Sequence, residues 1–312
     1  MKILVTGASG FVGRHLLSSL RESGQEVISF GRSEGPVLEG VEHRTGDEST
    51  DFSRHLEGVN AVVHAAGLAH QSGSPESLKK RFFEVNRDWT ARIAGAVADS
   101  GVETLLHISS IAAAGVPEDR RSPGIRESDE IVPLSDYGKS KREAEARVLE
   151  ALRDTGKLAV NVRPPLIYGR GTKGNWDKLC RLAKLPVPLP FASVRNRRSY
   201  LSVHNLGGFV NSVLSRTGET AQSGTYHVAD AETLSLAEVV RAIRNGLGRS
   251  ACLIPFPGFA MELPLRLAGK AAMAEGLFSD LVVDSTKAQD AFSWEPEIKT
   301  EAGMSDSVEK SG

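Results

Sequence analysis

A glycine-rich turn near the start of the chain constrains the fold more than any other feature. Residues 2–6 read KILVT, residues 6–13 read TGASGFVG with the spacing G-x-x-G-x-x-G, and an amphipathic stretch follows over 14–22. In a strand–turn–helix unit, glycine permits positive φ and close approach of the backbone to a diphosphate, which then meets the unpaired N–H groups of the helix. The pattern predicts a dinucleotide-binding turn. Its expected cofactor-binding residues are Gly7, Ser9, Gly10, Phe11, Val12 and Gly13.

The first half of the chain alternates strand-like and helix-like stretches. Strands are expected over 2–6, 26–30, 41–45, 61–65, 104–108 and 158–162, and helices over 14–22, 76–99 and 135–155. Regular alternation of strand and helix indicates parallel strands joined by right-handed crossovers. Residues 1–165 are therefore predicted to form an α/β domain, a Rossmann-like doubly wound parallel sheet that binds NAD(P).

The pattern changes after Arg163. Five of the 14 prolines lie between 164 and 190, where they disfavour regular helix. Further on, short apolar pieces alternate with loops, and helices are expected near 205–215 and 235–246. We expect residues 166–312 to form a smaller, loop-rich C-terminal substrate-binding domain, with some segments returning to the first domain.

The composition excludes several classes of partner. The formal net charge is −1 and the pI is about 6.7, so no basic field is expected to attract nucleic acid or anionic lipid. Two cysteines, without a C-x-x-C pair or a cluster with histidine, indicate neither a disulfide framework nor a metal site. No apolar run approaches the roughly 20 residues of a membrane-spanning helix. We expect a cytoplasmic protein without a metal, a nucleic-acid partner or membrane insertion.

Two short segments are expected to contact the adenosine end of the cofactor. An acidic residue after the second strand would hold the ribose hydroxyls of NAD, whereas this chain has Gly31-Arg32-Ser33 there. Arg32 could pair with the 2′-phosphate of NADP. NAD or NADP is therefore expected, with Arg32 favouring NADP. Asp47, after the third strand, is expected either to hydrogen-bond the adenine or to form a plain turn.

The polar helix expected over 135–155 begins with the segment SDYGKSK, in which Tyr137 and Lys141 lie four residues apart. That spacing places both side chains on one face of the helix, one turn apart. A free tyrosine has a pKa of about 10 and is a poor base at neutral pH, but a nearby ammonium and a positive nicotinamide would stabilise its phenolate. Ser109 and Ser110, after the fifth strand, offer hydroxyls that could polarise a substrate carbonyl or alcohol. The combination predicts hydride chemistry with a tyrosine acid/base.

These motifs resemble those of the extended short-chain dehydrogenase/reductase family, in particular its NAD(P)-dependent nucleotide-sugar epimerase/dehydratase branch. The matching segments cover most of the chain: residues 6–13, 64–67, 85–86, 109–110, 137–141, 163–169, 174–175, 198, 203, 284–285 and 294–296. The resemblance implies that Tyr137 is the catalytic acid/base, that Lys141 binds the nicotinamide ribose and lowers the tyrosine pKa, and that Ser110 holds the reacting oxygen. It also implies cofactor contacts for Ala65, Ala66, Gly67, Asn86, Ser109 and Pro164, and contacts to the substrate diphosphate for Asn175 and Arg198.

Two activities use these catalytic residues alike. An epimerase, like the UDP-glucose and UDP-N-acetylglucosamine 4-epimerases of this branch, would remove hydride from C4 of a UDP-hexose or UDP-N-acetylhexosamine and return it to the other face. A 4-ketoreductase would deliver hydride once, from NADPH, to a UDP-4-keto-6-deoxy-N-acetylhexosamine. Family frequencies favour the epimerase, and Arg32 favours the reductase.

Two further activities are disfavoured. Ile111 and Ala112 follow Ser110 where sugar dehydratases carry an Asp-Glu pair, which argues against elimination of water. A non-catalytic dinucleotide sensor is disfavoured because Tyr137 and Lys141 are both present. We expect a homodimer that acts on a UDP-sugar.

Overall fold

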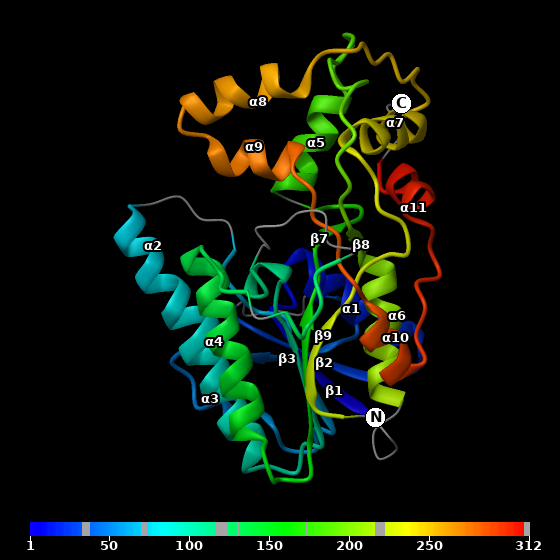
Figure 1. The fold of residues 1–312 in the computed structure, drawn as a ribbon. Helices are drawn as coiled ribbons and strands as arrows, with labels where there is room; N and C mark the ends of the chain where they lie inside the picture. Colours follow the sequence, from blue (N-terminus) through cyan, green and yellow to red (C-terminus); the bar gives the residue numbers. More distant parts are fainter. Residues whose placement is uncertain are drawn as a thin grey trace.

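The computed structural model describes residues 1–32, 38–69, 74–115, 124–129, 131–172, 174–215 and 222–308. A parallel sheet with helices on both faces forms the larger part of the molecule. A smaller region that contains several helices lies beyond the carboxyl ends of its strands (Figure 1).

Seven parallel strands form the sheet in the described part of the chain. They are β1 (Lys2–Thr6), β2 (Glu26–Gly31), β3 (Glu42–Thr45), β4 (Ala61–His64), β5 (Thr104–Ile108), β6 (Leu158–Arg163) and β9 (Gly224–His227), in the order β3-β2-β1-β4-β5-β6-β9. The strand order reverses its direction between β1 and β4. At such a switch point a doubly wound sheet opens a crevice outside its carboxyl ends, where ligands bind. The predicted α/β Rossmann-like sheet is confirmed.

Helices cover both faces of this sheet (Figure 1). One face carries α2 (Pro75–Phe82), the π-helical segment η2 (Phe83–Asp88), α3 (Trp89–Ala98) and α4 (Asp136–Ala151), and the other carries α1 (Phe11–Glu22), α6 (Val203–Ser215) and α10 (Thr286–Phe292). Two short 3-10 turns, η1 (Phe52–His55) and η3 (Ile111–Ala113), lie in loops. The strands and helices expected in residues 1–165 all occur, with ends shifted by a few residues.

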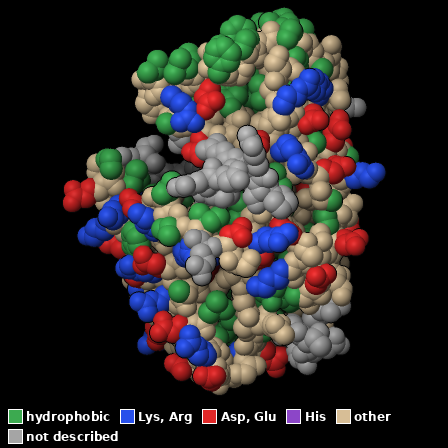
Figure 2. Space-filling view, viewed as in Figure 1, with side chains coloured by type: hydrophobic (Ala, Val, Ile, Leu, Met, Phe, Trp, Pro, Cys, Tyr) green, Lys and Arg blue, Asp and Glu red, His purple; other side chains and the backbone are tan. Residues whose placement is uncertain are grey.

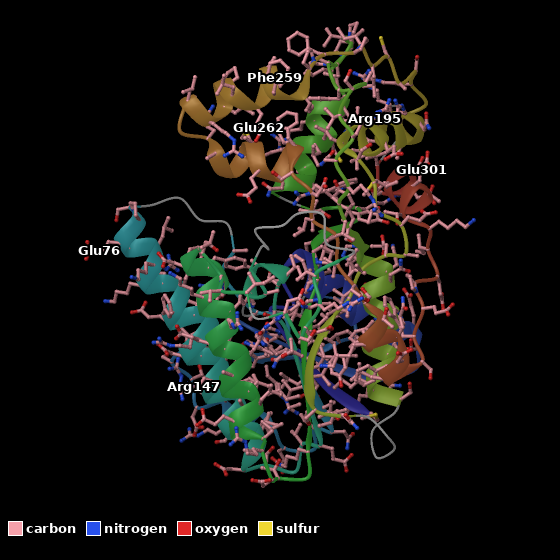
Figure 3. All side chains as sticks on the ribbon, viewed as in Figure 1. Glu76, Arg147, Arg195, Phe259, Glu262 and Glu301 are labelled. Atoms are coloured by element: carbon pink, nitrogen blue, oxygen red, sulfur yellow. The ribbon has the colours of Figure 1, made fainter. Side chains whose placement is uncertain are left out.

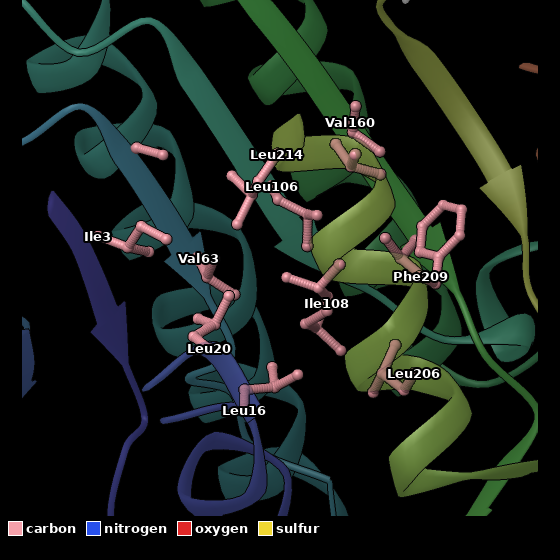
Figure 4. Close-up of a cluster of buried hydrophobic side chains, with 14 of the residues drawn as sticks. Ile3, Leu16, Leu20, Val63, Leu106, Ile108, Val160, Leu206, Phe209 and Leu214 are labelled. Carbon is pink, nitrogen blue, oxygen red and sulfur yellow. The ribbon is translucent and has the colours of Figure 1, made fainter. Parts of the chain in front are cut away.

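Two buried clusters hold the layers together. On the α1 and α6 side, Leu16, Leu106 and Phe209 belong to a cluster with no accessible side-chain surface at these positions (Figure 4). On the α3 and α4 side, Leu105 and Ile93 belong to a second cluster. Because the sheet is buried on both faces, its strands appear in the sequence as continuous apolar runs rather than as alternating ones.

The smaller region contains five helices and two short strands in the part of the chain that is described. Its elements are β7 (Leu166–Tyr168), α5 (Asn175–Ala183), β8 (Tyr200–Ser202), α7 (Leu236–Gly246), α8 (Gly258–Leu267), α9 (Ala271–Phe278) and α11 (Thr300–Asp306). β7 pairs in parallel with β8, and Trp176, Val240 and Ile243 pack in a third buried cluster. The prolines at 186–190 lie in the irregular connection between α5 and β8, and further irregular stretches separate the other helices, so the expectation of a loop-rich region stays open.

Segments of the second half return to the sheet, as expected. Strand β9 pairs with β6, and α6 packs against α1. At the outer edge of β9, Lys287 Nζ donates to the Thr225 carbonyl at 2.8 Å, and Glu127 accepts from the His227 N–H. Charged side chains thus occupy an edge that could otherwise pair with another strand. The division into residues 1–165 and 166–312 stays a prediction, since β9 and α6 belong to the larger layer.

Candidate active site

The turn between β1 and α1 has the geometry of an anion-binding site. Gly7 has φ +67°, and a Cβ at this position would lie 2.6 Å from the backbone N of Ala66, so only glycine fits. Gly10 is the N-cap of α1 and supplies no side-chain cap, and the first turn contains no acidic residue. The N–H groups of Phe11, Val12 and Gly13 in that turn therefore face no competing side-chain acceptor and can bind a diphosphate.

A cavity of about 230 Å³ lies beside this turn, at the switch point of the sheet. Its lining joins the ends of four neighbouring strands: Gly7, Ser9 and Gly10 after β1, Gly31 and Arg32 at β2, Gly46 and Asp47 after β3, and Ala65, Ala66 and Gly67 after β4. The sequence placed these residues in separate segments, and the structure brings them to one cavity.

Two cations line the cavity. Arg32 comes from the end of β2, as expected, and Arg81 comes from α2. The sequence analysis missed Arg81. In the sequence it is one of three consecutive basic positions on a polar helix, and only the tertiary fold distinguishes it from Lys79 and Lys80.

Asp47 forms a turn at the rim of the cavity. Its Oδ1 accepts hydrogen bonds from the backbone N of Ser49 at 2.8 Å and from the Ser49 hydroxyl at 2.7 Å. These bonds lower the pKa of the Asp47 carboxyl. The plain turn is therefore present, and the adenine contact stays a prediction for a residue that also lines the cavity.

Three successive turns of α4 hold the end of β5. Lys141 Nζ donates to the Ile108 carbonyl at 2.9 Å, the Ser109 hydroxyl donates to Glu145 Oε1, and the Tyr137 phenol lies beside the Ser110 hydroxyl. Positions spaced by four residues share one helix face, so 137, 141 and 145 reach the same short segment. The structure thus brings the predicted tyrosine, lysine and serines together.

The helix begins at a position that fixes this register. Ser135 is its N-cap, and the Ser135 Oγ accepts from the backbone N of Gly138 at 3.0 Å. The Tyr137 ring packs edge-on against Phe82 of α2, with ring centroids 5.7 Å apart. Tyr137 is thereby held from both α2 and the end of β5.

Burial dominates the titration of the two candidate catalytic groups. It raises the pKa of Tyr137, and the hydrogen bond with Ser110 opposes this shift. Burial lowers the pKa of Lys141 to about 8, and the carboxylate of Glu145 opposes that shift. The expected lowering of the tyrosine pKa is therefore not a property of these side chains alone, and a positive charge beside the phenol would have to supply it.

A buried ion pair lies under this cluster. Arg163 donates to both Glu145 carboxylate oxygens, from Nε at 3.0 and 3.1 Å and from Nη2 at 2.6 Å. Both side chains are buried. Such a bidentate pair fixes the carboxylate that accepts from Ser109. The sequence analysis missed Glu145, because a glutamate on a helix with polar flanks has the appearance of a surface residue.

The segment after β4 joins the cofactor cavity to the lysine. Gly67 lines the cavity, and a Cβ there would lie 3.0 Å from Lys141 Nζ and 3.2 Å from Asn86 Oδ1. Asn86, in η2, accepts from the Leu68 N–H and donates to the Leu68 carbonyl and to Ser140 Oγ. The Asn86 side chain is completely buried, and these hydrogen bonds are the ones that its amide group makes. Asn86 therefore acts on the expected cofactor site by positioning the loop.

The remaining predicted residues lie farther along the chain. Pro164 follows β6, and its carbonyl accepts from the Ile111 N–H at 2.9 Å, beside the Ser110 turn. Asn175 is the first residue of α5, and Arg198 donates from Nη1 to the Glu275 and Ser279 carbonyls. Arg198 thus also holds the end of α9. Diphosphate contacts for Asn175 and Arg198 stay predictions.

Comparison with known proteins agrees with this geometry. A model of the NAD dependent epimerase/dehydratase family matches residues 3–229. A UDP-glucose 4-epimerase from Vibrio cholerae is 32% identical over 307 residues, covering 97% of this chain and 93% of the relative. The chain belongs to the NAD-dependent epimerase/dehydratase family. It is an NAD(P)-dependent enzyme of the extended short-chain dehydrogenase/reductase type.

Two further proteins are similar to this chain over nearly its whole length. A 3-beta-hydroxysteroid dehydrogenase from Mycolicibacterium neoaurum is 28% identical over 335 residues, covering 98% of this chain and 90% of that protein. The crystal structure of a UDP-N-acetylglucosamine 4-epimerase from Bacillus cereus superimposes with a TM-score of 0.78 at 23% identity, covering 98% of this chain and 97% of the other. This second likeness shows the shared fold.

The residues of this chain fit NAD(P). Glycines, which have no Cβ atom, line the cavity beside α1, and the first turn of α1 has no acidic side chain. Arg32 and Arg81 in the cavity lining offer positive charge to phosphates. Gly67 leads from this cavity to Lys141. The site therefore has a place for the diphosphate at one end and an ammonium at the other.

Replacing Glu145 by alanine should destabilise the fold by about 3–5 kcal/mol, because it leaves the Arg163 guanidinium buried without its partner. Urea unfolding followed by circular dichroism measures the difference. The control is the double variant Glu145→Leu with Arg163→Met, which removes both charges and should lose less than Glu145→Ala. A double variant that loses as much stability as Glu145→Ala, or more, would show that an unpaired buried Arg163 is not the cause of the loss.

Proposed function

We propose that the protein is a nucleotide-sugar 4-epimerase that acts on C4 of a UDP-hexose or UDP-N-acetylhexosamine. The observation that carries this proposal is the group of Tyr137, Ser110 and Lys141, whose lysine Nζ lies beside Gly67 in the lining of the cavity. The Vibrio cholerae relative, a UDP-glucose 4-epimerase aligned over nearly its whole length, supports the sugar substrate.

The chemistry assigned to Tyr137 is proton transfer at the C4 oxygen. When bound, NAD(P) supplies the hydride acceptor and donor. The Tyr137 phenolate would take the proton of the C4 hydroxyl as that carbon is oxidised to a ketone, and the phenol would return it when the sugar is reduced on its other face. General acid–base catalysis of this kind contributes about 10²–10⁴-fold in rate.

Ser110 and Lys141 would support that proton transfer. The Ser110 and Tyr137 hydroxyls lie beside each other, so a substrate oxygen bound by both would meet two hydroxyl groups. The Lys141 ammonium has three N–H donors and uses one on the Ile108 carbonyl. Its remaining donors would bind the nicotinamide ribose, and its charge would favour the phenolate.

Tyr137→Phe should lower turnover about 10²–10⁴-fold, since it removes the acid/base while keeping the ring that packs on Phe82. Coupled-enzyme assay of UDP-galactose formation from UDP-glucose measures it, with UDP-N-acetylglucosamine as a second substrate. Tyr226→Phe is the control and should leave turnover unchanged. It removes a hydroxyl that belongs to the outer strand β9 and donates to the Gln222 carbonyl. Turnover of Tyr137→Phe within about tenfold of wild type would refute the role of Tyr137.

A 4-ketoreductase is the second candidate, and the cations of the cavity favour it. Arg32 and Arg81 both line the cavity. Arg32 follows the end of β2, where an acidic residue would select NAD. A guanidinium there can pair with the 2′-phosphate of NADP. A reductase would use external NADPH on a UDP-4-keto-6-deoxy-N-acetylhexosamine, with Tyr137 donating the proton to the new hydroxyl.

Arg32→Ala should weaken NADPH binding about ten- to a hundredfold, the equivalent of one charge-assisted hydrogen bond, and leave NADH binding nearly unchanged. Gly31→Asp should shift preference towards NADH, and a Cβ at Gly31 meets no atom within 4 Å, so the side chain fits. Fluorescence titration of both cofactors measures the affinities, with Arg54→Ala on η1 as the control. If Arg32→Ala weakens the binding of NADPH and NADH equally, the proposed pairing of Arg32 with the 2′-phosphate is refuted.

A further inference from the structure

Large apolar side chains gather at the outer end of the smaller region, away from the sheet. We call this surface the apolar end face, and its members are Val187, Ile254, Phe256, Phe259, Leu263 and Leu267, all exposed. Figure 2 shows hydrophobic side chains along this end of the molecule, over α8, with basic side chains beside them. Figure 3 places Phe259 there, on α8. Contiguous apolar surface of this kind marks an interaction site.

Helix α8 provides the centre of this face. Phe259, Leu263 and Leu267 recur every four residues, which aligns them on one side of the helix. They are 75%, 56% and 80% exposed, and no residue of α8 is buried. A surface helix of a globular protein normally turns such a stripe to the core. Here Met261 makes the inward contact with the third cluster and the stripe faces solvent.

The loops beside α8 are held in a defined position. The buried side chain of Arg244 in α7 donates hydrogen bonds to five backbone carbonyls, those of Ala183, Leu185, Val187, Ala251 and Cys252. It thereby ties together the two segments that carry Val187 and Ile254. The exposure of these side chains is therefore a property of an ordered surface.

The segments that form and flank the apolar end face carry more positive than negative charge. The flanking segments 177–187 and 249–275 contain six cations, Lys178, Arg181, Lys184, Arg249, Arg266 and Lys270, against three carboxylates, Asp177, Glu262 and Glu275. Two of those carboxylates pair within their own helices, Asp177 with Arg181 and Glu262 with Arg266. A local excess of positive charge thus lies in a chain whose formal net charge is −1.

We propose that the apolar end face docks on an anionic phospholipid surface. Phenylalanine and leucine on one side of a helix, with lysine and arginine beside them, is the arrangement of helices that lie in a membrane interface. The ten residues of α8 measure about 15 Å, half of the roughly 30 Å hydrocarbon core, so α8 lies along the surface. Within the described ranges, no helix combines the length and the apolar character that a membrane span requires.

Charge favours this occupant over a second copy of the chain. A two-fold contact places the same patch on both subunits, so it would bring two positively charged surfaces together. A surface of anionic headgroups instead attracts each lysine or arginine near it, by the equivalent of about fivefold in affinity per residue.

Co-sedimentation of the full-length protein with vesicles tests the proposal. We expect binding to phosphatidylcholine vesicles that contain phosphatidylglycerol, little binding to phosphatidylcholine alone, and weaker binding as salt is raised. Phe259→Asp with Leu263→Asp should abolish binding, and Lys184→Gln with Lys270→Gln should weaken it more than tenfold. Leu134→Asp is the matched control, because Leu134 is 86% exposed but lies in the loop before α4.

The replaced side chains are exposed, so the variants should keep the wild-type thermal midpoint and UDP-sugar turnover. Vesicle binding that is equal for wild type and the Phe259/Leu263 variant would overturn the proposal. So would a wild-type protein that ignores both vesicle types and forms a dimer by analytical ultracentrifugation that this variant cannot form, since the face would then belong to a second copy.

Discussion

The rest of this site depends on the contacts between one face of α4 and the end of β5. Tyr137, Lys141 and Glu145 each reach residues 108–110, so one helix face sets the position of the serine pair, the phenol and the ammonium together. The Glu145–Arg163 pair extends this contact to β6, the next strand of the sheet. The geometry of the reacting groups is thus tied to the most buried part of the molecule.

The same edge of the sheet joins the two halves of the site. The proposed dinucleotide cavity lies at the switch point between β1 and β4. Gly67, in the segment after β4, lines this cavity and also lies next to Lys141. Asn86 holds this segment against Ser140 of α4 through its buried amide. The lining of the proposed cofactor cavity and helix α4, which carries the proposed catalytic residues, are therefore positioned by one hydrogen-bonded unit rather than by two independent elements.

Features that depend on residues close together in the sequence could be predicted, and features that depend on packing between distant segments could not. The Gly7 turn and the Tyr137–Lys141 pair depend on local spacing, and both occur as expected. Arg81 and Glu145 depend on which helix packs where, and neither differs in the sequence from an ordinary surface charge. The net charge of the whole chain likewise says nothing about the local excess of cations around α8, a helix that the sequence analysis did not expect.

The proposed epimerase removes hydride from C4 of the sugar and returns it to the same carbon. The direct measurement uses UDP-glucose and UDP-N-acetylglucosamine carrying deuterium at C4, incubated with the purified protein without added cofactor, and NMR of the products. The account predicts the C4 epimer with deuterium retained at C4 and no net consumption of cofactor. A product that has lost the deuterium would contradict it, and so would a protein that leaves both sugars unchanged but oxidises NADPH stoichiometrically with a UDP-4-keto-6-deoxy-N-acetylhexosamine.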